Sequence, residues 1–369
     1  MSRLVHHSLT LRALYAGAMA DAFLRYRNPL RRAADRHRVA FYQQAWQRAA
    51  EELGGTLRPV GGGVSEICVE GLRTRVVENT SAIDDPVTLA VLADKALTHR
   101  ILADVSVPTP RHVVFTLRTI GIASTFIEDA NDDCVVKPAA GTGGGRGVTT
   151  GVRTPFQLAR AAAAAAVYGD DLIVERQVAG DNYRLLYLDG DLVDAFVRRP
   201  PTVIGDGSST VGALVRREND RRLSRGSGVS QVLLTVDLDM RRTLARQRLS
   251  LRSVPAAGRA VVLKAVVNEN AGADNATATD VLCDGLVEEC ARAVRALRVR
   301  LAGVDVITTD PSVPLRDSGG VVLEVNAPPN FYYHYHKRDG AYPVALHVLR
   351  RLLLERRPPG ARREVAHAL

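Results

Sequence analysis

The chain has 369 residues, which is enough for two or three packed units with a core of ordinary size. Its 46% hydrophobic and 24% charged residues are typical of a globular protein and exclude a disordered chain. Lys and Arg outnumber Asp and Glu by 49 to 40, but the arginines lie in short pairs without interleaved aromatic residues, so the sequence does not favour nucleic-acid binding. No apolar run reaches the roughly 18 residues of a membrane span.

The cysteines and the N-terminal segment bear on the compartment. The four cysteines have neither CxxC spacing nor a framework pattern, so we expect reduced, buried thiols. Small residues at 16–20 resemble a signal-peptide cleavage site, but Arg12 interrupts the apolar region. Residues of the segment fit one face of an amphipathic helix instead, namely Leu11, Leu14, Tyr15, Met19 and Phe23. The sequence therefore predicts a cytoplasmic protein.

The first half of the chain alternates between helical and strand patterns. Residues 1–85 read as helices followed by short strands, and Gly54-Gly55 ends a helix whose apolar positions are Phe41, Ala45, Ala49 and Leu53. Further along, we expect a helical stretch at 84–104, a strand at 112–115, a helix to residue 129, a strand at 134–138, an alanine-rich helix at 159–166, and strands at 172–175 and 183–188. Asp189-Gly190 then predicts a hairpin turn.

The second half is richer in strands. Residues 198–230 read as loops, and we expect strands at 261–267, 304–307 and 321–324 and helices at 284–298 and 343–355. The order of elements is mixed, without a regular strand–helix–strand alternation. It predicts an α+β fold and argues against a doubly wound sheet.

A glycine-rich loop is the first candidate site. Lys137 ends a predicted strand, and five glycines follow within 141–147. Glycine lets the backbone approach phosphate oxygens, and successive N–H groups can form an anion nest. The loop matches neither GxxxxGK[ST] nor GxGxxG. A flexible surface loop is the alternative interpretation.

The segment 172–184 is the second candidate. A strand ends in Glu175, an apolar Val178 follows, and a turn then carries Asp181 and Asn182. Such a segment can offer an acceptor for the adenine amino group, a backbone donor for a ring nitrogen, and a polar group for a ribose. A plain hairpin with a solvated turn fits the segment almost as well.

Oxygen-bearing side chains on two apolar strands are the third candidate. Asp305 interrupts one strand, and Glu324 and Asn326 lie two residues apart on the next, so they share a face. Buried carboxylates need a partner. Magnesium, held by one or two carboxylates plus nucleotide phosphates, would supply it. Pairing of each carboxylate with an arginine is the alternative.

The order of these features resembles the ATP-grasp superfamily, which includes D-alanine–D-alanine ligases, glutathione synthetases and the ligase domain of cyanophycin synthetase. The likeness is greatest to cyanophycin synthetase and the bifunctional glutathione synthetases. It rests on blocks at 180–186, 198–215 and 261–280 and covers about residues 90–350. It implies a preATP-grasp-like α/β domain at 1–90, two α+β subdomains at 91–178 and 179–355 that grip ATP, and a mobile tail at 356–369.

The resemblance also implies ATP and Mg²⁺ as cofactors. Nucleotide contacts would come from Lys95, Lys137, Gly143, Gly144, Gly145, Glu175, Val178, Asp181 and Asn182, metal ligands would be Asp305, Glu324 and Asn326, and catalytic cations would be Lys264 and Arg199. Two positions depart from the family pattern. Relatives usually have an acidic residue in place of Asn182 and an arginine in place of Lys264, and lysine lacks the bidentate fork of arginine.

The function implied by the resemblance is ligation: a carboxylate is activated as an acyl phosphate and joined to an amine. Both substrates would be small molecules, without nucleic-acid or membrane partners, and a homodimer is compatible with the sequence. A phosphotransferase and a non-catalytic nucleotide-binding protein are the alternatives. The aromatic and basic segment 331–338 allows three interpretations: substrate contacts, plain packing, or a transition-metal site built on His334 and His336.

Overall fold

The computed structural model describes residues 2–27, 29–140, 145–224 and 232–356. The N-terminal region has two long helices, α1 (Ser2–Tyr26) and α2 (Pro29–Glu52), followed by an antiparallel sheet of β1 (Thr56–Gly61), β2 (Val64–Val69) and β3 (Leu72–Val76). As predicted, Phe41, Ala45 and Ala49 face inward from α2, where they share a core with the C-terminal helix α12 (Val344–Arg356).

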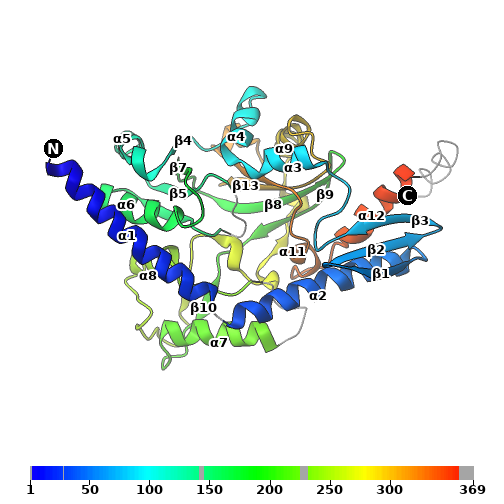
Figure 1. The fold of residues 1–369 in the computed structure, drawn as a ribbon, viewed down its shortest axis with the longest axis horizontal. Coiled ribbons are helices and arrows are strands. Elements are labelled where there is room, and N and C mark those ends of the chain that lie inside the picture. Colours follow the sequence, from blue (N-terminus) through cyan, green and yellow to red (C-terminus); the bar gives the residue numbers. More distant parts are fainter. Residues whose placement is uncertain (1, 28, 141–144, 225–231, 357–369) are drawn as a thin grey trace.

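Helix α1 lies along α6 at one end of the molecule (Figure 1). Leu11, Leu14 and Tyr15 are half-buried, as the predicted apolar face requires. Met19 and Phe23 are 44% and 58% exposed, because the covered stripe continues through Ala18 and Ala22 and leaves both to one side of it. The predicted face is therefore correct only in its N-terminal part.

A four-stranded antiparallel sheet forms the next layer, in the order β4-β7-β5-β6. Its strands are β4 (His112–Phe115), β5 (Cys134–Pro138), β6 (Thr149–Val152) and β7 (Leu172–Arg176). Helices α3 (Pro86–Ala93) and α4 (Lys95–Asp104) precede it, and α5 (Ile120–Ala130) and α6 (Pro155–Ala165) bury their apolar faces against it. The small side chains of α6 let this alanine helix lie close to the strands, so its low complexity is structural.

A five-stranded antiparallel sheet carries the larger part of the core, in the order β12-β9-β8-β13-β14. The strands are β8 (Asp181–Leu188), β9 (Asp191–Arg198), β12 (Ala276–Thr277), β13 (Leu301–Thr308) and β14 (Val321–Asn326). Helix α9 (Asp284–Ala296) covers one face through Leu286, Cys290 and Val294. The predicted hairpin joins β8 to β9, with positive φ at both Asp189 (53°) and Gly190 (90°), as a type I′ turn requires.

A small lobe lies between β9 and β12. It contains β10 (Thr202–Ile204) paired with β11 (Ala260–Val262), and helices α7 (Val211–Ser224) and α8 (Leu238–Arg246). The prediction of loops over 198–230 is therefore wrong for the strand at 202–204 and for the helix at 211–224. Val211, Leu214 and Val215 have helical spacing and are buried in the core of the lobe, but many charged residues around them hide the pattern. The strand expected at 261–267 ends at Val262.

Short helical turns complete the chain: Leu117–Thr119, Val267–Glu269, Gly272–Asp274, Thr279–Val281, α10 (Leu315–Ser318) and α11 (Tyr332–Tyr335). The fold is α+β, as predicted. Two large antiparallel sheets are joined by the small lobe, and α2 with the sheet β1–β3 packs on one face of the larger sheet. Within the described ranges, no helix has the length and apolar character of a membrane span.

Candidate functional site

A cavity of about 460 Å³ opens between the two large sheets. The smaller sheet contributes Lys137 and Glu175 to its wall, and the larger sheet contributes Asn182, Asp305 and Glu324. Backbone and side chains of 265–268, which follow β11 of the lobe, close a third side. The volume lies in the range of small-molecule sites.

Strand register places the polar residues of the larger sheet in one row. Arg184 on β8 is paired with Asp305 on β13, which is paired in turn with Glu324 on β14. Directly paired residues of antiparallel strands point to the same face, so all three face the cavity. Asn326 lies two residues beyond Glu324 on that face, as predicted, whereas Val304 and Val306 point to the opposite, apolar face.

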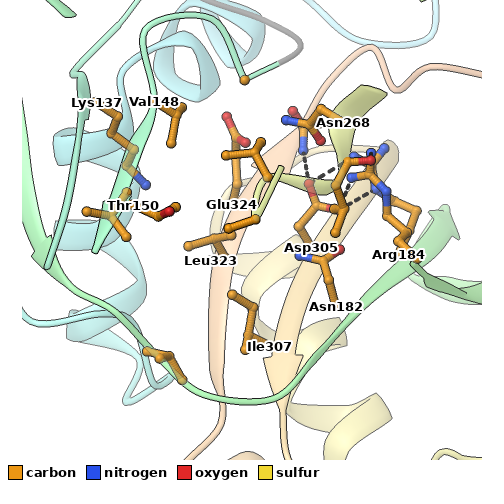
Figure 2. A pocket seen from close by; sticks show the side chains of 18 of the residues that line it. Lys137, Val148, Thr150, Asn182, Arg184, Asn268, Asp305, Ile307, Leu323 and Glu324 are labelled. Carbon is orange, nitrogen blue, oxygen red and sulfur yellow. Dashed lines mark hydrogen bonds and ion pairs between the residues drawn. The ribbon is translucent and has the colours of Figure 1, made fainter. Parts of the chain in front are cut away.

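The carboxylate of Asp305 forms ion pairs with two arginines. Arg184 donates from Nε to Oδ1 (2.6 Å) and from Nη2 to Oδ2 (2.9 Å), and Arg198 Nη1 lies 3.6 Å from Oδ1 (Figure 2). Asn326 Nδ2 also donates to Oδ2, at 3.2 Å. Burial alone would raise the pKa of Asp305, but the two guanidiniums outweigh it and the pKa is lowered. The carboxylate is therefore ionised, and arginine pairing, one of the two interpretations of Asp305, is present.

These oxygen ligands suit a magnesium ion that also binds phosphate. Among the residues that the structure describes, no three His, Cys, Asp or Glu side chains gather as a metal cage. Mg²⁺ does not need one, because one or two carboxylates plus nucleotide oxygens suffice. Asp305, Glu324 and Asn326 offer this set on one wall, and Glu324 remains 27% exposed beside its ion pair with Lys95. The residues fit Mg²⁺ in company with a phosphate chain.

Two lysines approach the cavity from the smaller sheet and from α4. Lys95 is the first residue of α4, and its Nζ lies 3.0 Å from Glu324 Oε1. Lys137 on β5 lies 2.8 Å from Glu175 on β7, and both side chains are almost fully buried. Each lysine is thus neutralised by one carboxylate, and both line the cavity as predicted.

Of the glycine-rich loop, the structure describes residues 145–147, and Gly145 lines the cavity. Its φ is +72°, and a Cβ there would come within 2.8 Å of Val266 and 2.9 Å of Asn268. Only glycine fits so close an approach. Gly143 and Gly144 lie outside the described residues. Beyond the loop, Thr150 lines the cavity and donates to the buried carboxylate of Asp239 at 2.7 Å.

The predicted nucleotide-binding segment lies along the cavity between the two sheets. Glu175, Val178, Asp181 and Asn182 all line it. Asp181 is also paired with Arg199 on the outside, at 2.9 Å from both carboxylate oxygens. The structure therefore brings together every described residue predicted for nucleotide or metal binding.

The two predicted catalytic cations lie elsewhere. Lys264 is buried in the lobe, where its Nζ lies 2.6 Å from Asp237 and 2.9 Å from Glu269, and it is not part of the cavity wall. Burial lowers the pKa of Lys264, but the two carboxylates outweigh it and the pKa is raised. Arg199 is exposed because β9 ends at Arg198, so alternation along the strand turns Arg198 inward and its neighbour outward.

Sequence reasoning missed Arg184 and Arg198, which both line the cavity. A signal for Arg184 was present: it lies in the strand predicted at 183–188, two residues after the candidate Asn182. The strand begins at Asp181 in the structure, so both side chains lie on the same face. Arg198 carries no such signal, because its neighbour Arg199 is an equal candidate until the end of the strand is known.

The aromatic segment 331–338 serves mainly for packing. It forms the short helix α11, so His334 and His336 do not share a strand face. His334 is fully buried and bonds to Asp194 at 2.7 Å, and Phe331 lies in the core beside α2. Of this segment, Tyr333 lines the cavity. A metal cluster on the two histidines is absent from the described residues.

No family model matches the chain. It is 35% identical over 257 residues to a cyanophycin synthetase from Nostoc sp., which covers 67% of this chain and 27% of that protein. It is 29% identical over 286 residues to a bifunctional glutathione biosynthesis protein from Mannheimia succiniciproducens, covering 75% of this chain and 37% of the relative. The chain thus spans between about a quarter and two fifths of the length of these relatives.

A crystal structure of a bifunctional glutathione synthetase from Pasteurella multocida superposes with a TM-score of 0.53 and 22% identity, over 84% of this chain and 43% of that chain. The fold is therefore ATP-grasp. The sequence is similar to part of the cyanophycin synthetases and of the bifunctional glutathione biosynthesis proteins.

Proposed function

We propose that the protein is an ATP- and Mg²⁺-dependent ligase that activates a carboxylate as an acyl phosphate and joins it to an amine. One observation carries the proposal: a single cavity brings together two lysines, the end of a glycine-rich loop, and a row of metal-type oxygen ligands. The sequence similarity to cyanophycin synthetase and glutathione biosynthesis proteins supports amide-bond formation as the chemistry.

In this proposal the smaller sheet and α4 hold the nucleotide. Lys95, Lys137 and the backbone around Gly145 bind phosphate oxygens. Glu175 and Val178 contact adenine, while Asp181 and Asn182 contact the ribose. Asp305, Glu324 and Asn326 hold Mg²⁺, which supplies charge neutralisation at the transferring phosphoryl group.

The chemistry runs in two balanced steps. A carboxylate oxygen of the acid attacks the γ-phosphorus of ATP, an acyl phosphate forms, and ADP leaves. The amine nitrogen then attacks the acyl carbon, the C–O bond to phosphate breaks, and phosphate departs while the nitrogen loses a proton. The protein positions the reactants and stabilises negative charge, since no Ser-His-Asp arrangement is needed for either step.

Lys264 takes a different role from the one that the family pattern implies. Its ion pairs to Asp237 and Glu269 fix the chain just before residues 265–268, whose backbone and side chains form one cavity wall. We propose that Lys264 is a positioning residue. Arg184 and Arg198 are then the cations nearest to the Asp305 side of the cavity.

A screen of amino acids and peptides in pairs, with ATP and Mg²⁺, tests the ligase proposal. We expect free phosphate only when acid and amine are both present, together with an amide of the combined mass. A stable phosphorylated product with one substrate alone would identify a phosphotransferase instead. We expect small-molecule substrates handled in the cytoplasm, without nucleic-acid or membrane partners.

A further inference from the structure

Arg198 is a buried cation with few partners. Its side chain is 3% exposed and lines the cavity at the end of β9. Arg184 already takes both oxygens of Asp305, so Arg198 approaches that carboxylate only at 3.6 Å. Its Nη2 donates weakly to the Val267 carbonyl (3.4 Å), and its Nε has no hydrogen-bond partner among the described residues. A guanidinium so deeply buried normally has every N–H satisfied.

The described charged residues that line the cavity include one more cation than carboxylates, and Arg198 is that cation. Three cation–carboxylate pairs face inward: Lys95–Glu324, Lys137–Glu175 and Arg184–Asp305. Among the lining residues that the structure describes, the two other charged ones, Arg176 and Asp181, are paired outward with Asp132 and Arg199. One positive charge therefore remains, at Arg198. Burial lowers the pKa of Arg198, and the carboxylates of Asp305 and Glu324 only partly oppose it.

The side chains around Arg198 can enclose a planar group. The guanidinium lies 5.3 Å from the centre of the Tyr333 ring, and the Tyr333 hydroxyl is fixed by a hydrogen bond to the Asn268 carbonyl at 2.9 Å. The Asn268 side chain also lines the cavity. An aromatic face and an amide beside a forked cation suit a carboxylate, which needs two parallel donors.

We propose that Arg198 binds a second carboxylate of the acid substrate, one that is not activated, so that the substrate is a dicarboxylate of the amino-acid or peptide type. The inference rests on the proposed ligase function and deepens it. One surplus charge matches one carboxylate. The phosphate chain instead meets the lysines and Mg²⁺ beside the glycine-rich loop. The other anion that could reach Arg198 is the phosphoryl group of the acyl phosphate, and the experiment separates the two.

The experiment traps the activated acid with hydroxylamine, so that no amine substrate is needed. Amino acids, simple dicarboxylic acids and dipeptides are screened for ATP-dependent hydroxamate formation. Each dicarboxylic acid that reacts is then supplied as its two mono-amides. One mono-amide lacks the reacting group and is inert. The other lacks only the carboxylate that we assign to Arg198.

With wild-type protein, we expect this second mono-amide to react with a kcat/KM on the order of 100-fold below that of the diacid, the loss typical of removing one partner of a buried charge pair. In Arg198→Gln the diacid falls to the level of the mono-amide, and the preference disappears. Arg198→Lys restores part of it. Arg295→Gln, an exposed arginine on the outer helix α9 paired with Glu288, is the matched control and keeps the wild-type preference.

Three results would overturn the inference. The first is an acid with a single carboxylate as the preferred substrate. The second is an equal loss for diacid and mono-amide in Arg198→Gln, which would assign Arg198 to the phosphoryl group. The third is the absence of any hydroxamate although calorimetry shows ATP binding, and this result alone would also remove the ligase proposal. ATP affinity and the melting temperature of Arg198→Gln, compared with Arg295→Gln, exclude misfolding as the cause.

Discussion

Two buried charge networks of similar composition lie in different parts of the molecule. In the lobe, Lys264 is held between Asp237 and Glu269. At the cavity, Asp305 is held between Arg184 and Arg198. The first has one cation and two carboxylates and is covered by the core of the lobe, while the second has two cations and one carboxylate and faces an open space.

Access of a ligand to the network and the balance of its charges decide what such a network can do. In the lobe network the charged groups satisfy one another: Lys264 contacts both carboxylates, and the Thr235 N–H donates to Glu269 at 2.7 Å. Burial raises the pKa of Glu269, although Lys264 opposes it. The cavity network instead leaves a positive charge next to space for a ligand. We therefore expect the first network to stabilise the lobe and the second to bind a ligand.

The largest expected effect comes from the cavity. Glu324→Gln removes a proposed metal ligand, so we expect turnover to fall on the order of 1000-fold, equal to about 4 kcal/mol of transition-state stabilisation. The melting temperature should change little because this side chain is partly exposed. Glu288→Gln, on the surface of α9, is the control. Turnover above a tenth of wild type would remove Glu324 from the metal site.

The lobe network should respond in stability. Lys264→Met leaves two carboxylates without their cation, and breaking a buried pair in this way typically costs about 3 kcal/mol or more. We expect a lower urea midpoint, with ATP affinity nearly unchanged in the variant that remains folded. A variant of normal stability that has lost hydroxamate formation would instead give Lys264 the catalytic role of the family pattern.

The nucleotide side of the cavity offers a third test. Lys137→Gln removes a phosphate-binding charge but keeps a hydrogen-bond donor near Glu175, so we expect the KM for ATP to rise about thirtyfold, or about 2 kcal/mol. Thermal unfolding without nucleotide should change less than thermal unfolding with it. Equal destabilisation in both conditions would show that the lysine serves only its ion pair.

The effect that is smallest at neutral pH is a pH dependence of stability behind the cavity. His99 on α4 is buried, and its Nε2 donates to the Leu323 carbonyl at 3.2 Å, next to Glu324. Burial, with the nearby Lys137, lowers its pKa to about 3. Between pH 6.5 and 3 the unfolded chain binds a proton there that the folded protein does not, so stability falls as pH decreases, by up to about 1.4 kcal/mol per pH unit. His99→Gln should flatten the urea-midpoint profile in this range, and an unchanged slope would contradict the assignment.

Much of this fold could be predicted because β-strands have a recognisable local sequence pattern with a period of two. Asp305, Glu324 and Asn326 interrupt apolar strands, and a period of two fixes which of them share a face. The hairpin at Asp189-Gly190 follows from turn chemistry alone. These are short-range properties, and the structure agrees with the sequence at each of them.

The properties that the sequence did not reveal depend on distant contacts. Helix α7 was missed because its buried residues are few among many charges, and only packing in the lobe makes the helix evident. Arg198 and Arg199 differ only in the direction that the end of β9 gives them. Lys264 follows a short strand, and where its side chain points is decided by Asp237 and Glu269, which lie outside that strand. The family pattern pointed to Lys264, but it gave no information on the side chains that surround this lysine.

Oxygen transfer from the acid tests the central claim most directly. The acid substrate is labelled with ¹⁸O in the reacting carboxylate, and the phosphate released with the amide is examined by mass spectrometry. An acyl phosphate requires that one carboxylate oxygen leaves with the phosphorus, so we predict one ¹⁸O atom in each released phosphate. Glu324→Gln should release labelled phosphate about 1000-fold more slowly, in step with its loss of turnover. Unlabelled phosphate released in step with amide formation would contradict the account, because the carboxylate would then have been activated by another route.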